Sequence, residues 1–278
     1  MLAIPFPHID PVLIELGPLV IRWYALAYLG GIMIGWWLVN RLMARASLWP
    51  ADTAPTDKQG VDDYVLWATL GIVLGGRLGY ILFYNFDHFM ADPSRILRVW
   101  EGGMAFHGGL AGVIIATILF CRRRNIPLLN FADALAMVAP LGLMFGRLAN
   151  FINGELWGRT ADLPWAMVFP GAGPLARHPS QLYEAGLEGL LLFVLLYGMG
   201  RFGGALKRPG TLVGLFFIGY GCARTFVEFF REPDPQLGFL MSFGSGGLTM
   251  GMMLSLPLVL IGIGFLIYGK QRQAPAHD

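Results

Sequence analysis

The chain has 278 residues, of which 55% are hydrophobic and 14% are charged, and its mean hydropathy is +0.58. A soluble globule of this length needs more polar surface, so we expect the chain to lie in a lipid bilayer. A formal charge of +2 is too small to indicate nucleic-acid binding. Cys121 and Cys222 match no metal or redox spacing, so neither a disulfide nor a cysteine nucleophile is expected.

Seven apolar stretches predict an all-α, polytopic membrane protein. A hydrocarbon core about 30 Å thick requires about 20 apolar residues per helix. The N-terminus has no basic region and no small-residue cleavage site, so the first apolar run is expected to be retained. The fifth stretch is short. The predicted spans are residues 18–40, 63–85, 105–121, 131–151, 184–200, 211–230 and 247–268.

Basic residues in the connections predict the orientation. Eleven of them fall on one side of the predicted spans and five on the other. By the positive-inside rule, the richer side is cytoplasmic, which places the N-terminus in the periplasm and the C-terminus in the cytoplasm. The richer set contains Arg41, Arg45, Lys58, Arg122, Arg123, Arg124, Arg201, Lys207, Arg208, Lys270 and Arg272, and the poorer set Arg95, Arg98, Arg159, Arg177 and Arg231.

The longest polar connection, residues 152–183, joins the fourth and fifth spans and is rich in Trp and Pro. Loops of this length inside compact domains are commonly functional. The chain contains no long repeat. Only short, similar sequences surround one arginine in the second span and one in the fourth. We therefore expect a single integral membrane domain over residues 1–278, with residues 152–183 forming its periplasmic segment.

Four arginines, Arg22, Arg77, Arg147 and Arg224, fall inside predicted spans, where each costs a few kcal/mol unless it is paired or faces water. The last three come out roughly 20–24 Å above the cytoplasmic start of their spans, at one depth near the outer leaflet. An arginine at that level either pairs with a carboxylate, snorkels to the interface or binds a lipid phosphate. Both structural and ligand-binding interpretations stay open for each.

Local spacing separates these arginines. Arg224 has Glu228 four residues later on the same helix face, whereas Arg147 has no acid within one turn. A guanidinium without a nearby carboxylate is suited to bidentate binding of phosphate, which makes Arg147 the candidate phosphate ligand. His107 lies among glycines at the same predicted outer level, and the ordinary pKa of histidine suits proton transfer near neutral pH, although a lone histidine at a membrane interface more often has a structural role. Asn150 and Glu155 follow Arg147 and indicate a polar pocket.

The stretch GRLANFINGELWG, residues 146–158, resembles the motif of the phosphatidylglycerol:prolipoprotein diacylglyceryl transferase family. Further blocks resemble this family in the same order and extend the resemblance over nearly the whole chain. They are IRWYALAY around Tyr24, GGRLGYILFYN around Arg77, GGMAFHGGL around His107, RHPSQLYE at residues 177–184 and RTFVEFFREPD at residues 224–234. One departure is Met252, which stands where the family commonly has Gln.

The resemblance implies a bacterial inner-membrane enzyme whose site faces the periplasm. Its substrates would be phosphatidylglycerol and the lipobox cysteine of a prolipoprotein, and its products a thioether and glycerol phosphate. In this interpretation Arg147 and Arg224 stabilise the leaving phosphate, while His107 or an arginine-bound water takes the thiol proton. No metal or nucleotide motif is present, so no cofactor is expected. The resemblance adds Tyr24, Asn150, Glu155, Tyr220, Glu228, Arg231 and Arg147 as phosphatidylglycerol-binding residues.

Two other classes of membrane protein share some of these sequence features. Buried arginines also suit a lipid flippase or transporter, but a carrier needs a site near the midplane, whereas these arginines are predicted at one outer level. A phospholipid phosphatase or a nucleotide-dependent phosphotransferase needs a histidine nucleophile or a metal-binding carboxylate cluster. Asp62, Asp63 and Asp133, which are the candidate carboxylates, fall on the predicted cytoplasmic side.

Overall fold

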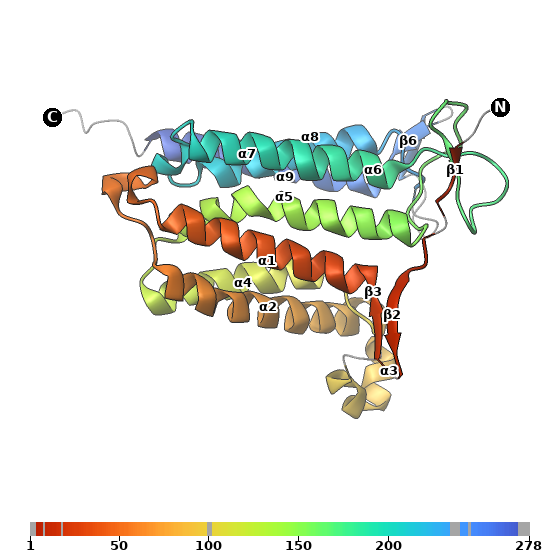
Figure 1. The fold of residues 1–278 in the computed structure, drawn as a ribbon, viewed down its shortest axis with the longest axis horizontal. Coiled ribbons are helices and arrows are strands. Elements are labelled where there is room, and N and C mark those ends of the chain that lie inside the picture. Colours follow the sequence, from red (N-terminus) through yellow and green to blue (C-terminus); the bar gives the residue numbers. More distant parts are fainter. Residues whose placement is uncertain are drawn as a thin grey trace. The chain divides into compact units, whose positions relative to one another are not determined.

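The computed structural model describes residues 4–7, 9–17, 19–98, 102–233, 240–243 and 246–271. Most of these residues are helical, and Figure 1 traces the elements along the chain. Asp234, which closes the last family-like block, and Arg272, which was counted among the cytoplasmic charges, lie outside the described residues.

Helices lie in all seven stretches that were predicted to span the membrane. Within the described residues, five are long and apolar enough to cross a membrane: α1, α2, α5, the continuous helix Ser180–Arg201 and α9. The fifth stretch is thus a full-length helix of 22 residues, and the sixth, α8, is the short one with 17. The bounds are α1 (Trp23–Met43), α2 (Lys58–Tyr84), α4 (Phe106–Arg124), α5 (Leu128–Ile152), α6 (Ser180–Glu184), the π-helical η5 (Ala185–Leu191), α7 (Leu192–Arg201), α8 (Thr211–Val227) and α9 (Met250–Gln271).

Short elements connect these helices. The strands pair in three two-stranded ladders, of which β1 with β4 is parallel and the other two, β2 with β3 and β5 with β6, are antiparallel. The short elements are β1 (Ile4–Pro5), β2 (Val12–Leu16), β3 (Leu19–Arg22), η1 (Ala46–Leu48), η2 (Pro50–Asp52), α3 (Phe86–Ala91), η3 (Pro93–Leu97), β4 (Met167–Val168), η6 (Ala205–Lys207), β5 (Met241–Phe243) and β6 (Gly246–Leu248).

The hairpin β2–β3 corrects the first predicted span. Arg22 is the last residue of β3 and pairs in register with Val12, so the expectation that Arg22 lies inside a membrane helix is wrong. Gly17, with a φ of 62°, turns the chain, and the aliphatic segments on both sides form the ladder that satisfies their backbone groups. The helix therefore begins only at Trp23.

Contacts divide the chain into two compact units, of which the first contains residues 1–38 and 133–278 and the second contains residues 39–132. In the second unit α2 packs closely against α4 through glycines. A Cβ placed on Gly75 would come within 2.8 Å of the Cα of Gly112, and one placed on Gly79 within 2.8 Å of the Cα of Gly108. These glycines let the two backbones come into contact, as small residues commonly do between membrane helices.

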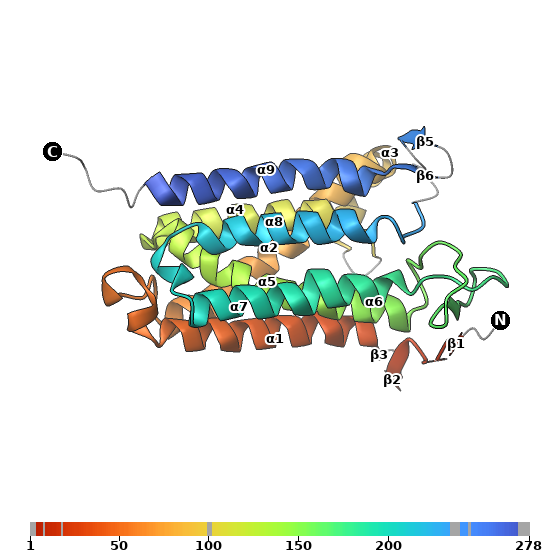
Figure 2. The same ribbon diagram turned by 90° about the horizontal axis from the view of Figure 1, so that it is seen from above.

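Two helices of the first unit, α8 and α9, lie side by side, as both ribbon views show (Figures 1 and 2). Gly214 and Gly262 face each other there, because a Cβ on either would meet the carbonyl oxygen of the other. The start of α8 is fixed by α5, since the buried carboxylate of Asp133 accepts the backbone N–H groups of Gly210 at 2.7 Å and Val213 at 2.9 Å. Asp133 thereby caps a helix that has no side-chain cap of its own.

Candidate functional site

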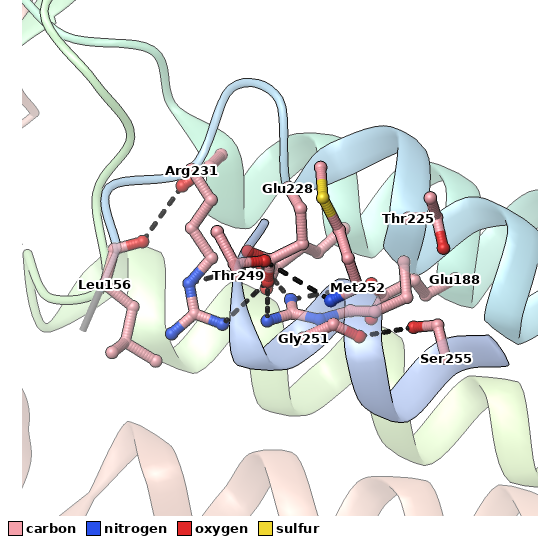
Figure 3. A network of polar contacts seen from close by, with 12 residues as sticks. Leu156, Glu188, Thr225, Glu228, Arg231, Thr249, Gly251, Met252 and Ser255 are labelled. Carbon is pink, nitrogen blue, oxygen red and sulfur yellow. Dashed lines mark hydrogen bonds and ion pairs between the residues drawn. The ribbon is translucent and has the colours of Figure 1, made fainter. Parts of the chain in front are cut away.

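A cluster of three arginines and three glutamates lies in the first unit, where α5, the helix beginning at Ser180 and α8 come together. Figure 3 shows part of it beside the first turn of α9. All six side chains are at least four-fifths buried, and the arginines contact the carboxylates of other segments as well as of their own. We name these six residues the arginine–glutamate cluster: Arg147, Glu184, Glu188, Arg224, Glu228 and Arg231.

Glu184 is the centre of the arginine–glutamate cluster. Its side chain has no exposed area, and its two oxygens contact different arginines: Oε2 lies 2.6 Å from Nε of Arg147, and Oε1 lies 2.9 Å from Nη1 of Arg224. Arg231 is at the edge, with its Nε 4.0 Å from Oε1 of Glu184. One carboxylate therefore bridges arginines from two helices and a following segment.

The other two glutamates complete the charge balance. Glu188, also fully buried, lies 3.9 Å from Nη2 of Arg147 and 3.8 Å from Nη1 of Arg224. Glu228 forms an ion pair with Nη2 of Arg224 and lies 3.9 Å from Nη1 of Arg231. Three guanidinium groups face three carboxylates, so the cluster is formally neutral when all six groups are ionised. This balance allows the charges to remain buried.

Two glycines make room for these carboxylates. Gly189 follows Glu188, and a Cβ there would come within 2.5 Å of the Cβ of Met144, one turn before Arg147 on α5. Gly251 is in the first turn of α9, and a Cβ there would come within 2.6 Å of the carboxyl carbon of Glu228. Figure 3 shows Gly251 and Glu228 close together in the network. Both glycines thus permit close approaches that bring the acids to the arginines.

Met252, which stands where the resembled family commonly has Gln, also lies in this first turn of α9. Its backbone N–H donates to Oγ1 of the buried Thr249 at 3.3 Å, which caps the helix (Figure 3). The contact uses the main chain of Met252, so it does not depend on the identity of that side chain.

A second polar group adjoins the arginine–glutamate cluster along α5. Nδ2 of Asn150, which is less than one turn after Arg147, donates to the hydroxyl of Tyr24 at 3.1 Å and to Oε1 of Glu155 at 2.9 Å. Asn153 donates to the same Glu155 oxygen at 3.3 Å. Asn150 is buried whereas Glu155 is exposed, so the hydrogen-bonded chain leads from the helix interior to the surface.

The start of the Ser180–Arg201 helix holds the loop that follows α5. The buried Ser180 donates to the carbonyl of Leu156 at 3.0 Å, and the buried Gln181 donates to the carbonyl of Glu155 at 2.5 Å. Leu156 has a φ of 58°, a left-handed conformation that costs a residue with a branched side chain free energy. The two family-like sequence blocks that contain residues 155 and 181 are therefore in direct contact.

The loop 152–183 also covers the C-terminal end of α8. Arg159 donates from Nε to the carbonyl of Arg231 at 2.9 Å and from Nη2 to the carbonyl of Glu228 at 3.2 Å. A Cβ at Gly158 would come within 2.6 Å of the Cβ of His178, so only glycine fits there. Partial burial, followed by the charge of Arg159, lowers the pKa of His178, which favours its neutral form at pH 7.

The two remaining predicted site residues belong to different compact units. Tyr220 is half-buried on α8, one turn before Arg224, with its ring stacked on that of Phe216 at 6.0 Å. His107 is exposed in the first turn of α4 and belongs to the second compact unit. The structure thus brings together the predicted residues of the first unit, while His107 is described only within its own unit.

Arg77 differs from the other arginines of the predicted spans. It is 5% exposed, and its guanidinium donates to five backbone carbonyls of the segment before α4, among them Ile96 at 3.1 Å and Arg98 at 3.1 Å. The others are Arg95, Gly102 and Gly103. The guanidinium of Arg77 therefore stabilises the backbone conformation of the segment that precedes His107.

The partners of Arg147 correct one step of the sequence analysis. The expectation that this guanidinium lacks a nearby carboxylate is wrong, because Glu184 and Glu188 reach it from another helix. Sequence reasoning missed both acids, although each is a carboxylate within an apolar span and so meets the criterion that was applied to the arginines. Within the described residues, no group of three or more His, Cys, Asp or Glu side chains is arranged to hold a metal ion.

Comparison with known proteins identifies the family. The model of the family "prolipoprotein diacylglyceryl transferase" matches residues 11–268. The chain belongs to the prolipoprotein diacylglyceryl transferase family. Curated phosphatidylglycerol–prolipoprotein diacylglyceryl transferases are similar over nearly their whole length. That of Agrobacterium fabrum is 58% identical, with 93% of this chain and 91% of the relative covered. That of Rhodospirillum rubrum is 57% identical, with coverages of 98% and 96%.

The family match includes every residue of the arginine–glutamate cluster and the Tyr24–Asn150–Glu155 group. The resemblance drawn from the sequence motifs is therefore confirmed. A prolipoprotein diacylglyceryl transferase acts on lipids, and the five apolar helices of suitable length agree with a multi-pass membrane protein of this family.

Proposed function

We propose that this chain transfers the diacylglyceryl group of phosphatidylglycerol to the thiol of the lipobox cysteine of prolipoproteins, the first step of lipoprotein maturation. The name of relatives at 54–58% identity supports this substrate pair. The observation in the structure that carries the proposal is the arginine–glutamate cluster, because transfer from a phospholipid requires buried cations beside a phosphate.

The contacts of Arg147 support the proposal that it is the phosphate ligand. The ion pair of Arg147 with Glu184 is made through Nε at 2.6 Å, and its ion pair with Glu188, through Nη2, is longer at 3.9 Å. The two Nη groups are the ones that bind a phosphate in a fork geometry. Both Nη groups of Arg224, in contrast, already face Glu184 and Glu228. Arg224 therefore contributes mainly positive potential to the site.

The reaction exchanges one bond at a glyceryl carbon. The substrate sulfur forms a bond to this carbon while the bond from the carbon to a phosphate oxygen breaks, and that electron pair leaves with glycerol phosphate. The thiol proton goes to His107 or to an arginine-bound water. Ionising a thiol of ordinary pKa at pH 7 costs about 2 kcal/mol, which a neighbouring base offsets. Arg147 and Arg224 stabilise the charge that develops on the phosphate.

The remaining predicted residues orient the lipid headgroup in this proposal. Tyr24, Asn150 and Glu155 already form one hydrogen-bonded chain next to Arg147. Such a chain offers a hydroxyl and a carboxylate to the glycerol hydroxyls of the headgroup. Tyr220, Glu228 and Arg231 line the α8 side. The reaction needs no cofactor, so we expect EDTA to leave the rate unchanged.

The membrane arrangement is part of the same proposal. We infer seven spans in the bacterial inner membrane, with the N-terminus and the site toward the periplasm and the C-terminus in the cytoplasm. Residues 1–278 then form a single membrane domain, and residues 152–183 its periplasmic segment. The charge asymmetry of the connections supports this orientation.

The test is transfer of labelled lipid from phosphatidylglycerol to a lipobox peptide by the purified full chain. We expect the cysteine peptide to be labelled and the same peptide with serine to remain unlabelled. Arg147→Ala should lower the rate by at least a hundredfold, because the phosphate loses its ligand.

The matched control is Arg124→Ala, since Arg124 forms an exposed ion pair with Asp63 in the other unit. It should retain the wild-type rate. A folded wild type that transfers nothing to the cysteine peptide would refute the proposal, and lipid translocation across vesicles would then be the activity to measure.

A further inference from the structure

Two buried carboxylates in the arginine–glutamate cluster, Glu184 and Glu188, have no place in the reaction as written. They lie one turn apart on one helix, and both have no exposed side-chain area. Burying an ionised carboxylate is costly unless it is paired, and both acids are paired with arginines that the proposed site uses. Their presence at the arginines therefore calls for a function.

The geometry around Glu184 fixes the distance between two arginines. Its oxygens contact Nε of Arg147 at 2.6 Å and Nη1 of Arg224 at 2.9 Å, so one rigid carboxylate spans the gap between α5 and α8. Oε1 accepts a hydrogen bond from Arg224, whereas Oε2 accepts none from the described residues, so its contact with Arg147 is a close ion pair. A carboxylate in this position sets the spacing of the two guanidinium groups.

Glu188 contributes charge rather than hydrogen bonds. Its oxygens lie 3.8 and 3.9 Å from the nearest guanidinium nitrogens of Arg224 and Arg147, and both are buried atoms that accept no hydrogen bond from the described residues. At these distances Glu188 still lowers the positive potential of both arginines.

We propose that Glu184 is a positioning residue of the transfer site, which orients Arg147 and Arg224 toward one phosphate, and that Glu188 sets the positive charge available to that phosphate. This inference rests on the proposed function and deepens it. The two acids of this helix have different roles. Glu184 acts through the geometry of the arginines, whereas Glu188 acts through the electrostatic potential that the arginines produce at the phosphate.

The two roles predict different kinetic effects. Glu184→Gln keeps the shape but removes a charge, so the cluster becomes more positive while the arginines lose their bridge. We expect kcat to fall at least tenfold, while glycerol phosphate, used as a competitive inhibitor, binds more tightly. Glu188→Gln should tighten inhibitor binding by a similar factor with a much smaller loss of kcat. A residue that only stabilises the fold would not separate kcat from inhibitor binding in this way.

A second pair of variants tests the position without changing a charge. Gly189→Ala forces the helix that carries both Glu184 and Glu188 away from Met144, because the new Cβ would lie 2.5 Å from the Cβ of that residue. Gly186→Ala is the control in the same π-helical segment, since nothing lies within 4 Å of a Cβ there. We expect Gly189→Ala to lower kcat and Gly186→Ala to retain it. This pair also decides the matter if Glu184→Gln does not fold.

The experiment measures the rate of lipid transfer and the inhibition constant of glycerol phosphate for the purified full chain. Asp63→Asn, which removes a carboxylate from the exposed ion pair with Arg124, controls for loss of charge. If the wild type transfers lipid but Glu184→Gln has an unchanged kcat and inhibition constant, the positioning role is refuted. If the wild type transfers no lipid, the proposed function itself fails.

Discussion

Gly251→Ala tests whether Glu228 is held against Arg224 by the start of α9. The added methyl group would lie 2.6 Å from the carboxyl carbon of Glu228, whereas ordinary contacts begin near 3.4 Å. The carboxyl group, or the helix, must therefore move by more than about 0.8 Å, because Oε1 of Glu228 would lie nearer still than the carboxyl carbon. Glu228 is the flexible partner, so we expect it to withdraw from Arg224 and from Arg231.

The structure allows the size of this effect to be worked out. Complete loss of one partner of a buried ion pair costs about 3–5 kcal/mol. A shift that weakens the pair without removing it should cost less than half of this, about 1–2 kcal/mol. If that loss appears in the transition state, kcat/KM falls roughly five- to thirtyfold.

The assay is lipid transfer at several phosphatidylglycerol concentrations, together with thermal unfolding in detergent. Gly264→Ala is the control on the same helix, because nothing lies within 4 Å of a Cβ there. It should keep full activity and gain up to about 1 kcal/mol from helix propensity. Adding Glu228→Asp to Gly251→Ala shortens the acid and should recover part of the rate. Wild-type kcat/KM in Gly251→Ala would show that Glu228 does not need this contact.

Three further substitutions test packing and hydrogen bonding within the two units. Gly112→Ala places a methyl group 2.9 Å from the carbonyl carbon of Gly71 and should destabilise the α2–α4 pair by about 1–3 kcal/mol. Gly109→Ala is the control, because its methyl group would lie 3.5 Å from the nearest atom, and it should leave the melting temperature within a few degrees of wild type. Equal melting temperatures for the two would contradict the close packing. Arg77→Lys supplies three donors where five carbonyls are bound, and at least two lost hydrogen bonds should cost about 3 kcal/mol in unfolding experiments. Asp133→Asn turns an amide toward one of two backbone N–H donors and should cost about 1–2 kcal/mol; an unchanged stability would mean that α8 does not depend on this cap.

Local patterns in the sequence were sufficient to predict the positions of the helices and one ion pair. Apolar runs of about 20 residues placed a helix in every predicted span, since each run satisfies its own backbone hydrogen bonds. The pair of Arg224 with Glu228 follows from a spacing of four residues on one helix. The hairpin before Trp23 was missed because a length criterion for apolar residues does not distinguish strands from helices.

Contacts between distant segments were beyond such patterns. Glu184 meets Arg147 only because α5 and the Ser180–Arg201 helix pack together at Gly189, and no periodicity in the sequence registers that approach. Arg77 and Arg147 lie in similar sequences, GGRLGY and FGRLAN. Arg77 nevertheless binds backbone carbonyls, whereas Arg147 binds carboxylates. The local sequence favours an arginine at each place, but the partner comes from the tertiary fold.

The π-helical segment Ala185–Leu191 separates two parts of one membrane helix. A π turn contains about one residue more than an α turn, so residues before and after it are rotated relative to a continuous α-helix by about 100°. The acid at position 184 and the leucines of α7 therefore need not share a helical phase. Removing one residue from this segment would restore that phase and turn the acid away from its arginines, even though no cluster side chain had been changed.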